Sequence, residues 1–140
     1  MSKLVKLYNT TYQKYLSYLT NPTENGTYTV LMLNSDEVKD AKDLWEMVPV
    51  AQDVFTLLAP SLNAHLILLG DQNPNSPKGS AVAWLAKSSF MSPMEFKYDV
   101  DGEAIITNAG PVSQYLSALP NDPYAYFIAT KIDEWEIYLL

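Results

Sequence analysis

Apolar and charged residues alternate most clearly between residues 94 and 100. The apolar positions of this segment are Met94, Phe96, Tyr98 and Val100. Glu95, Lys97 and Asp99 lie between them, and this period of two is typical of a strand with one buried face. Asp101-Gly102 is a tight-turn pair and leads into residues 104–107, so we expect a β-hairpin here.

Five further segments have the composition of strands. Residues 27–33 are rich in β-branched and apolar side chains, and residues 65–69 form a short apolar run before Gly70. Residues 124–131 and 135–139 predict a second hairpin around Asp133-Glu134. Residues 80–88 fit an alanine-rich helix or a strand, and we favour a strand.

The spacing of apolar residues predicts helices elsewhere. Between residues 3 and 19 the apolar face of a helix would carry Leu4, Tyr8, Tyr12, Tyr15 and Leu19. Ser35 is a suitable N-cap for a second helix, which would end at Pro49. Residues 50–58 predict a third helix, and Gly110-Pro111 begins a short fourth one that reaches Leu119.

These elements predict an α+β fold. We expect a single domain over residues 1–140, with a mainly antiparallel sheet of about five to six strands. Three or four helices would pack on one face or at one end of this sheet. We find no internal repeat and no linker long enough to divide the chain.

The charged residues narrow the range of partners. The chain has nine lysines and no arginine, and its net charge is −7. Arginine supplies the planar fork that recognises phosphate and guanine, and the negative charge opposes approach to nucleic acids and anionic membranes. We therefore expect neither as a direct partner. Because the chain has no cysteine and no apolar run at its beginning, we expect it in the cytoplasm.

The sequence shows no catalytic or cofactor motif, so we assign no catalytic residue, no cofactor and no metal ligand. The five glycines are too far apart for a phosphate-binding loop. His65 is the only histidine and lies at the start of an apolar segment, where a structural role is more common than catalysis. Residues 99–103 resemble a calcium loop, but their glycine is fourth rather than sixth, so a hairpin turn explains them better.

Carboxylates on the predicted second helix form the candidate partner surface. They are Asp36, Glu37, Asp40, Asp43 and Glu46. If one tyrosine of the first predicted helix contacts a partner, Tyr18 is expected, because it lies at the flank of the apolar face. The loop at residues 71–79 is a further candidate for this surface.

The leading hypothesis is a non-enzymatic protein-interaction module that docks on a basic surface of a partner protein. Inhibitors and accessory factors of bacteriophages and mobile elements are proteins of this kind. The first alternative is a small-ligand-binding or enzymatic domain with a pocket near His65. The second alternative is a structural component of a larger assembly. The sequence does not indicate the oligomeric state.

Overall fold

The regular structure of the chain consists of β-strands. The computed structural model describes residues 2–34, 41–70, 81–87, 92–108 and 114–140, and these contain thirteen strands and no helix. The strands are β1 (Lys3–Asn9), β2 (Lys14–Leu19), β3 (Tyr28–Leu33), β4 (Ala41–Lys42), β5 (Trp45–Ala51), β6 (Val54–Ala59), β7 (Ala64–Gly70), β8 (Ala81–Ala86), β9 (Met94–Tyr98), β10 (Ala104–Asn108), β11 (Tyr115–Ala118), β12 (Ala125–Ile128) and β13 (Trp135–Leu139). All belong to one antiparallel sheet. The described residues therefore contain no helix that could cross a membrane.

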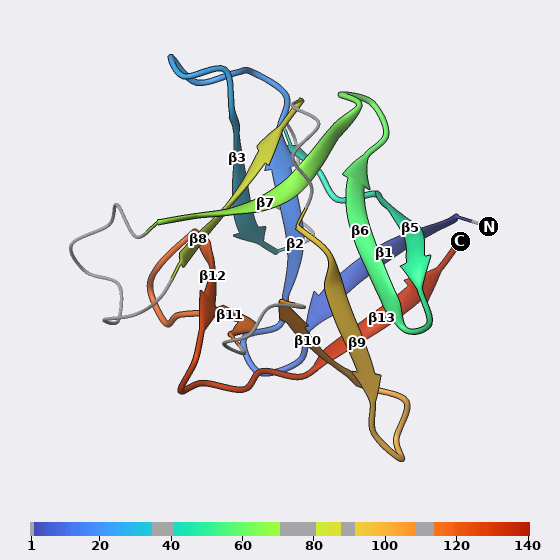
Figure 1. The fold of residues 1–140 in the computed structure, drawn as a ribbon. Coiled ribbons are helices and arrows are strands. Elements are labelled where there is room, and N and C mark those ends of the chain that lie inside the picture. Colours follow the sequence, from blue (N-terminus) through green and yellow to red (C-terminus); the bar gives the residue numbers. More distant parts are fainter. Residues whose placement is uncertain (1, 35–40, 71–80, 88–91, 109–113) are drawn as a thin grey trace.

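Six of the strands form a closed barrel. The ring runs β1–β5–β6–β9–β10–β13 and returns to β1, each neighbour paired in antiparallel fashion. Closure pairs the barrel strands on both sides, which removes the exposed edges of an open sheet. The beginning and the end of the chain lie on the same side of this barrel (Figure 1).

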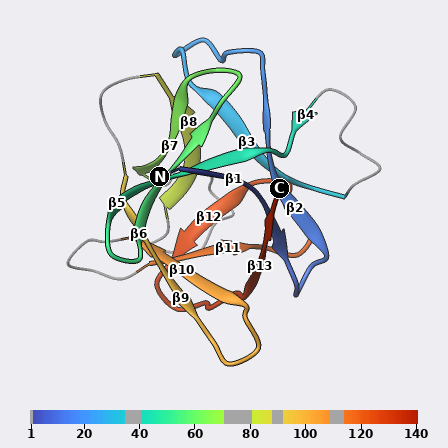
Figure 2. The same ribbon diagram turned by 90° about the vertical axis from the view of Figure 1, so that its right-hand side faces the viewer.

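Three hairpins close one end of the barrel. They are β2–β3, β7–β8 and β11–β12. Each begins with a strand that also pairs with the preceding barrel strand. The hairpins meet one another through β3–β8, β8–β12 and a bridge between Leu31 and Tyr124. Figure 2 shows the molecule from the side of the chain ends, with the barrel strands in front. A six-stranded barrel capped by three equivalent hairpins is a β-trefoil.

The chain contains three repeats of the same architecture, which are β1 to β5, β6 to β9 and β10 to β13. Leu16, Leu66 and Leu116 are fully buried and occupy the same place on the first strand of each hairpin. Their spacing is fifty residues in each case. Gln13 and Asn63 are also fifty residues apart, and both have a positive φ, at 57° and 51°, in the turn before a hairpin. The prediction that the chain contains no internal repeat is therefore wrong.

Two tryptophans tie hairpins to the barrel. Trp45 Nε1 donates a hydrogen bond to the carbonyl oxygen of Leu16 at 2.9 Å, and Trp135 Nε1 donates one to that of Leu116 at 3.0 Å. Both indoles are fully buried. Met94 occupies the corresponding position of the middle repeat, opposite Phe55. The packing thus follows the threefold pattern, whereas the hydrogen bond is made in only two of the repeats.

A second contact holds each hairpin two residues after the leucine that the three repeats share. Asp133, which is buried, accepts a hydrogen bond from the backbone N–H of Ala118 at 2.9 Å and one from Asn9 Nδ2 at 2.8 Å. Lys131 forms an ion pair with the other oxygen of Asp133. In the middle repeat, Ser92 Oγ accepts from the backbone N–H of Leu68 at 3.3 Å. In the first repeat, the short strand β4 pairs with β2 at this level.

The α+β prediction is wrong, and the helices are the reason. The first predicted helix is the β1–β2 unit, with a turn at residues 10–13. Residues 50–58 form the turn between β5 and β6 and most of β6. The fourth predicted helix contains strand β11, and residues 109–113 lie outside the described residues, as do residues 35–40 of the second.

The tyrosines produced the false helical pattern. Tyr8 and Tyr15 are half-buried on the outer side of the barrel, where their rings lie 4.9 Å apart between neighbouring strands. Val5 and Leu7 face the core with the period of two that a strand requires. Because both faces of β1 and β2 carry apolar side chains, the alternation was hidden and a spacing of four residues resembled a helix. The segments predicted as strands all contain strands. The second predicted hairpin is wrong, because β12 pairs with β11 and β8, whereas β13 pairs with β1 and β10.

We expect Trp45→Phe and Trp135→Phe each to lower the free energy of unfolding by about 2–4 kcal/mol, because each leaves a cavity and a buried carbonyl without its donor. Trp84→Phe is the matched control. Trp84 is half-buried and its Nε1 has no hydrogen-bond partner among the described residues, so the loss should stay within about 1 kcal/mol. Urea denaturation measures all three. Equal losses in the three variants would contradict a special role for the two indole hydrogen bonds.

Candidate functional site

The turn between β9 and β10 holds two carboxylates in a fixed position. Asp99 Oδ1 accepts hydrogen bonds from the backbone N–H groups of Asp101 at 2.9 Å and Glu103 at 3.0 Å. Backbone hydrogen bonds from Asp99 to Glu103 and from Gly102 to Asp99 close the turn. Gly102 has a φ of 84°, which glycine adopts without strain. The hairpin predicted for residues 99–103 is confirmed.

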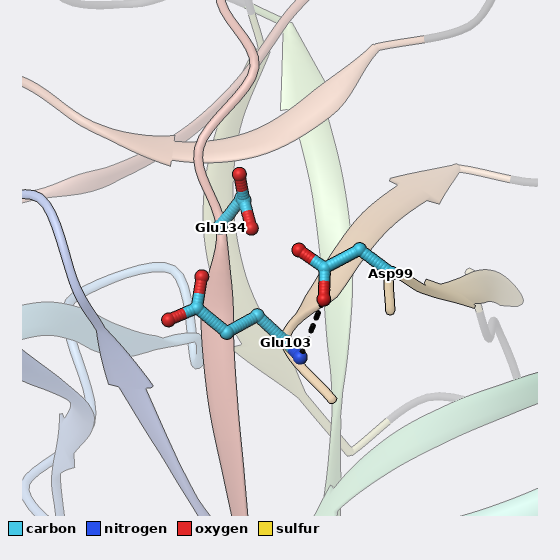
Figure 3. Close-up of side chains that lie close together, drawn as sticks. All are labelled: Asp99, Glu103 and Glu134. Carbon is cyan, nitrogen blue, oxygen red and sulfur yellow. Dashed lines mark hydrogen bonds between the residues drawn. The ribbon is translucent and has the colours of Figure 1, made fainter. Parts of the chain in front are cut away.

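Glu134 brings a third carboxylate to this turn. It lies directly before β13, and its carbonyl oxygen accepts hydrogen bonds from the backbone N–H and the hydroxyl of Thr10. One carboxylate oxygen from each of Asp99, Glu103 and Glu134 lies within 4.8 Å of the other two. Figure 3 shows the three side chains pointing toward one another from the hairpin and from the start of β13. We call these three residues the acidic cluster.

The crowding of negative charge changes how the acidic cluster binds protons. The pKa of Glu134 is raised from 4.5 to about 7, because its side chain hydrogen bonds with Asp99 and Glu103 and is repelled by their charges. The pKa of Asp99 is lowered, first by the hydrogen bond with Glu134 and then by the backbone N–H groups that it accepts. As the pH falls, the acidic cluster therefore takes up its first proton at a higher pH than an isolated carboxylate would.

A shallow hollow lies beside the same hairpin. Its volume is about 630 Å³, and it is lined by Gln52, Asp53, Glu95, Phe96, Lys97 and Tyr98. Asp53 belongs to the β5–β6 turn, and its carbonyl oxygen accepts a hydrogen bond from the N–H of Phe96 at 2.9 Å. The pKa of Tyr98 is raised by burial and by the charge of Asp53. Lys97 pairs with Glu95 at 3.2 Å, so the one lysine of this hollow already has an acidic partner.

Oxygen ligands and negative charge suit two kinds of cation. Carboxylates are the preferred ligands of calcium and magnesium, although calcium takes about six to eight oxygens and the acidic cluster supplies three side chains. Ammonium and guanidinium groups of a partner protein are bound by the same oxygens. The carboxylate oxygens of this site are therefore suited to binding a positively charged group.

The structure describes two of the five predicted partner carboxylates, Asp43 and Glu46, and neither belongs to the acidic cluster. Asp36, Glu37 and Asp40 lie outside the described residues. Asp43 is half-buried and pairs with Lys6 at 3.5 Å, and Glu46 is half-buried on β5.

Tyr18 belongs to the interior. Its side chain is 1% exposed, and its ring meets that of Trp45 edge-on at 4.9 Å. Its hydroxyl donates to the carbonyl of Leu44 at 3.2 Å, and burial raises its pKa. Tyr18 is therefore not placed to contact a partner. The flank position on which that expectation depended exists only on a helix. The loop at residues 71–79 lies outside the described residues.

His65 shows none of the geometry of a catalytic base in the described residues. It begins β7 and lies opposite Leu58 of β6. Burial lowers its pKa, and no described residue is hydrogen bonded to its Nδ1 atom. The hollow beside the β9–β10 hairpin lies at the opposite end of β6 from His65.

The sequence contained only part of the signal for the acidic cluster. Asp99 and Glu103 are recognisable together, because they flank one tight turn. Glu134 is thirty-one positions beyond Glu103, and only the pairing of β10 with β13 brings it close. The burial of Asp133 was missed because its hydrogen-bond partners Asn9 and Ala118 are distant in the sequence.

The chain was compared with known families, curated proteins and solved structures. No family model and no curated protein matches it. A similar solved structure is a salivary protein from Culex quinquefasciatus that belongs to the Cysteins and Tryptophan-Rich (CWRC) family. The two chains share 12% identity, the similarity covers 100% of this chain and 94% of the other, and the TM-score is 0.76. This likeness supports the fold.

We expect Glu134→Gln to stabilise the protein at about pH 8. The raised pKa means that the folded state favours protonated Glu134, so this contribution is full below pH 4.5 and is lost as the pH rises through about 7. Glutamine resembles the protonated form and removes the repulsion. The urea midpoint of the variant should exceed that of the wild type at about pH 8, and the gain should vanish near pH 4.

Glu24→Gln is the control, because Glu24 is exposed between β2 and β3. A gain for Glu134→Gln that is independent of pH would argue against charge repulsion within the acidic cluster.

Proposed function

We propose that this chain is a non-enzymatic protein-interaction module that binds a basic surface of a partner protein through the acidic cluster. The observation that carries the proposal is the uncompensated charge of this cluster. Among the described residues the ion pairs are Lys6–Asp43, Lys97–Glu95 and Lys131–Asp133. None of the three involves Asp99, Glu103 or Glu134.

The raised pKa of Glu134 has its largest causes in the hydrogen bonds with Asp99 and Glu103, and a cationic partner relieves the charge repulsion that adds to it. Lysine and arginine side chains form charge-assisted hydrogen bonds with carboxylates, and these are stronger than hydrogen bonds between neutral groups. The net charge of −7 adds a long-range attraction that speeds the encounter with a basic protein. The turn hydrogen bonds of Asp99 hold this acceptor in place before binding, which reduces the entropy lost in the complex.

The origin and location of the chain belong to the same proposal. We infer an accessory factor or inhibitor of the kind found in bacteriophages and mobile elements, acting in the cytoplasm. The absence of cysteine supports the location, because extracellular proteins of this size commonly contain disulfides. The salivary protein of similar fold belongs to a family named for its cysteines, and none of their chemistry is available to this chain.

The test compares two triple variants, each with three carboxylates replaced by amides. The first neutralises the acidic cluster with Asp99→Asn, Glu103→Gln and Glu134→Gln; the second neutralises Asp36, Asp40 and Asp43 in the same way. A short lysine homopolymer labelled with a fluorophore is the probe, and anisotropy gives its dissociation constant. We expect the first variant to bind at least about tenfold more weakly than the second, because it removes the carboxylates that the proposal assigns to the basic partner.

The comparison also separates local charge from total charge. Equal weakening in both triple variants would show that only the net charge matters, and unchanged binding in the first variant would exclude the acidic cluster. Repeating the titration with calcium shows whether a metal competes for the same oxygens. Tight calcium binding with no competition by the lysine probe would replace the proposed function by a metal site.

A further inference from the structure

Exposed apolar side chains gather around the end of the barrel opposite the hairpins. Among the described residues, the large hydrophobic side chains exposed at this end are Leu4, Val50, Tyr98, Val100, Leu139 and Leu140. Ile132, in the segment before β13, and Tyr138, opposite Lys6 on β13, are also exposed and are not counted in this set. We call these six residues the apolar rim.

Strand register places the apolar rim at one end. The pair Pro49–Phe55 precedes the β5–β6 turn, the pair Tyr98–Ala104 precedes the β9–β10 turn, and Val5 pairs with Leu139 beside the chain ends. The three pairs occupy equivalent positions in the threefold pattern. The backbone N–H of Leu140 donates to the carbonyl of Leu4 at 3.1 Å, which holds the last strand against the first.

Val100 connects the apolar rim with the acidic cluster. Its side chain is 101% exposed, at the tip of the hairpin between Asp99 and Asp101. Hydrogen bonds of the backbone and of Asp99 fix the turn, and Gly102 supplies its positive φ. The geometry of the turn therefore does not require a valine at position 100. An apolar side chain that is held in water between carboxylates contributes nothing to this fold by burial.

The charges around the apolar rim select among the possible partners. Asp53, Asp99 and Asp101 are exposed on the side of Val50, Tyr98 and Val100, where Lys97 is paired with Glu95; Lys3 is exposed beside Leu4. A second copy of this chain would bring the same carboxylates against one another, and an anionic lipid surface would be repelled by them. A polypeptide that carries positive charge next to apolar side chains matches both features.

We propose that the barrel end binds a partner segment in which lysine or arginine alternates with large apolar side chains. The apolar residues contact the rim at Val50 and Val100, and the basic residues contact Asp99, Asp101 and the rest of the acidic cluster. This inference rests on the proposed function and deepens it, because it names the chemistry of the partner. The apolar contact supplies preference among basic partners, while the carboxylates supply attraction for all of them.

The experiment uses two labelled peptides of equal length and charge, an alternating Lys–Leu peptide and an alternating Lys–Gly peptide. Anisotropy gives the dissociation constant of each for the full chain. We expect the wild type to bind Lys–Leu about tenfold more tightly than Lys–Gly, which is the effect of burying roughly one valine side chain. Val50→Ser together with Val100→Ser should abolish this preference and leave the affinity for Lys–Gly unchanged.

Ile132→Ser is the control for the loss of an exposed apolar side chain, because Ile132 is exposed to 57% and is not one of the six residues of the apolar rim. It should keep the full preference. Equal binding of the two peptides by the wild type, or a preference that survives the double substitution, would overturn this inference while leaving the proposed function in place. The proposed function fails instead if neither peptide binds the wild type. It also fails if the variant with a neutral acidic cluster binds both peptides as tightly as the wild type does.

Discussion

Two buried indole N–H groups hold the barrel and the hairpins together. A buried donor must find an acceptor, and the acceptors for Trp45 and Trp135 are carbonyl oxygens of Leu16 and Leu116, on the first strand of a hairpin. Each bond therefore joins the last strand of a repeat, β5 or β13, to the first strand of its hairpin, β2 or β11. The large ring also fills the space between barrel and cap, so one side chain serves both packing and hydrogen bonding.

The repeats share a frame and differ in their anchors. The middle repeat has Met94 in place of tryptophan and Ser92 in place of Asp133. The described residues of its hairpin β7–β8 make neither the indole hydrogen bond nor a buried ion pair, and they are held by apolar side chains such as Leu66 and Leu85. The three repeats thus share the positions and approximate volumes of their core side chains, but their polar contacts differ.

The sequence predicted seven of the thirteen described strands and placed the other six, β1, β2, β4, β5, β6 and β11, in helices. Residues 94–107 alternate because one face is buried and the other is polar, so their hairpin was visible. In β1 and β2 the outer face is covered by tyrosines, and two apolar faces leave no alternation to detect. The fifty-residue spacing of Leu16, Leu66 and Leu116 was present, but leucine is too common for three positions to indicate a repeat. Glu134 joined Asp99 only through barrel closure, which no local pattern contains.

The two chain ends occupy the corner that a tight turn occupies in each of the other two repeats. The hydrogen bond between Leu140 and Leu4 and the pairing of β1 with β13 hold this corner without a covalent link. The order in which the strands follow one another is thus separable from the contacts that they make. A circular permutant, with the present ends joined by a short linker and new ends opened at Ala51–Gln52, would keep every barrel pair and every hairpin. The order of the three repeats along the chain is therefore set by the covalent connections and not by the contacts between the strands.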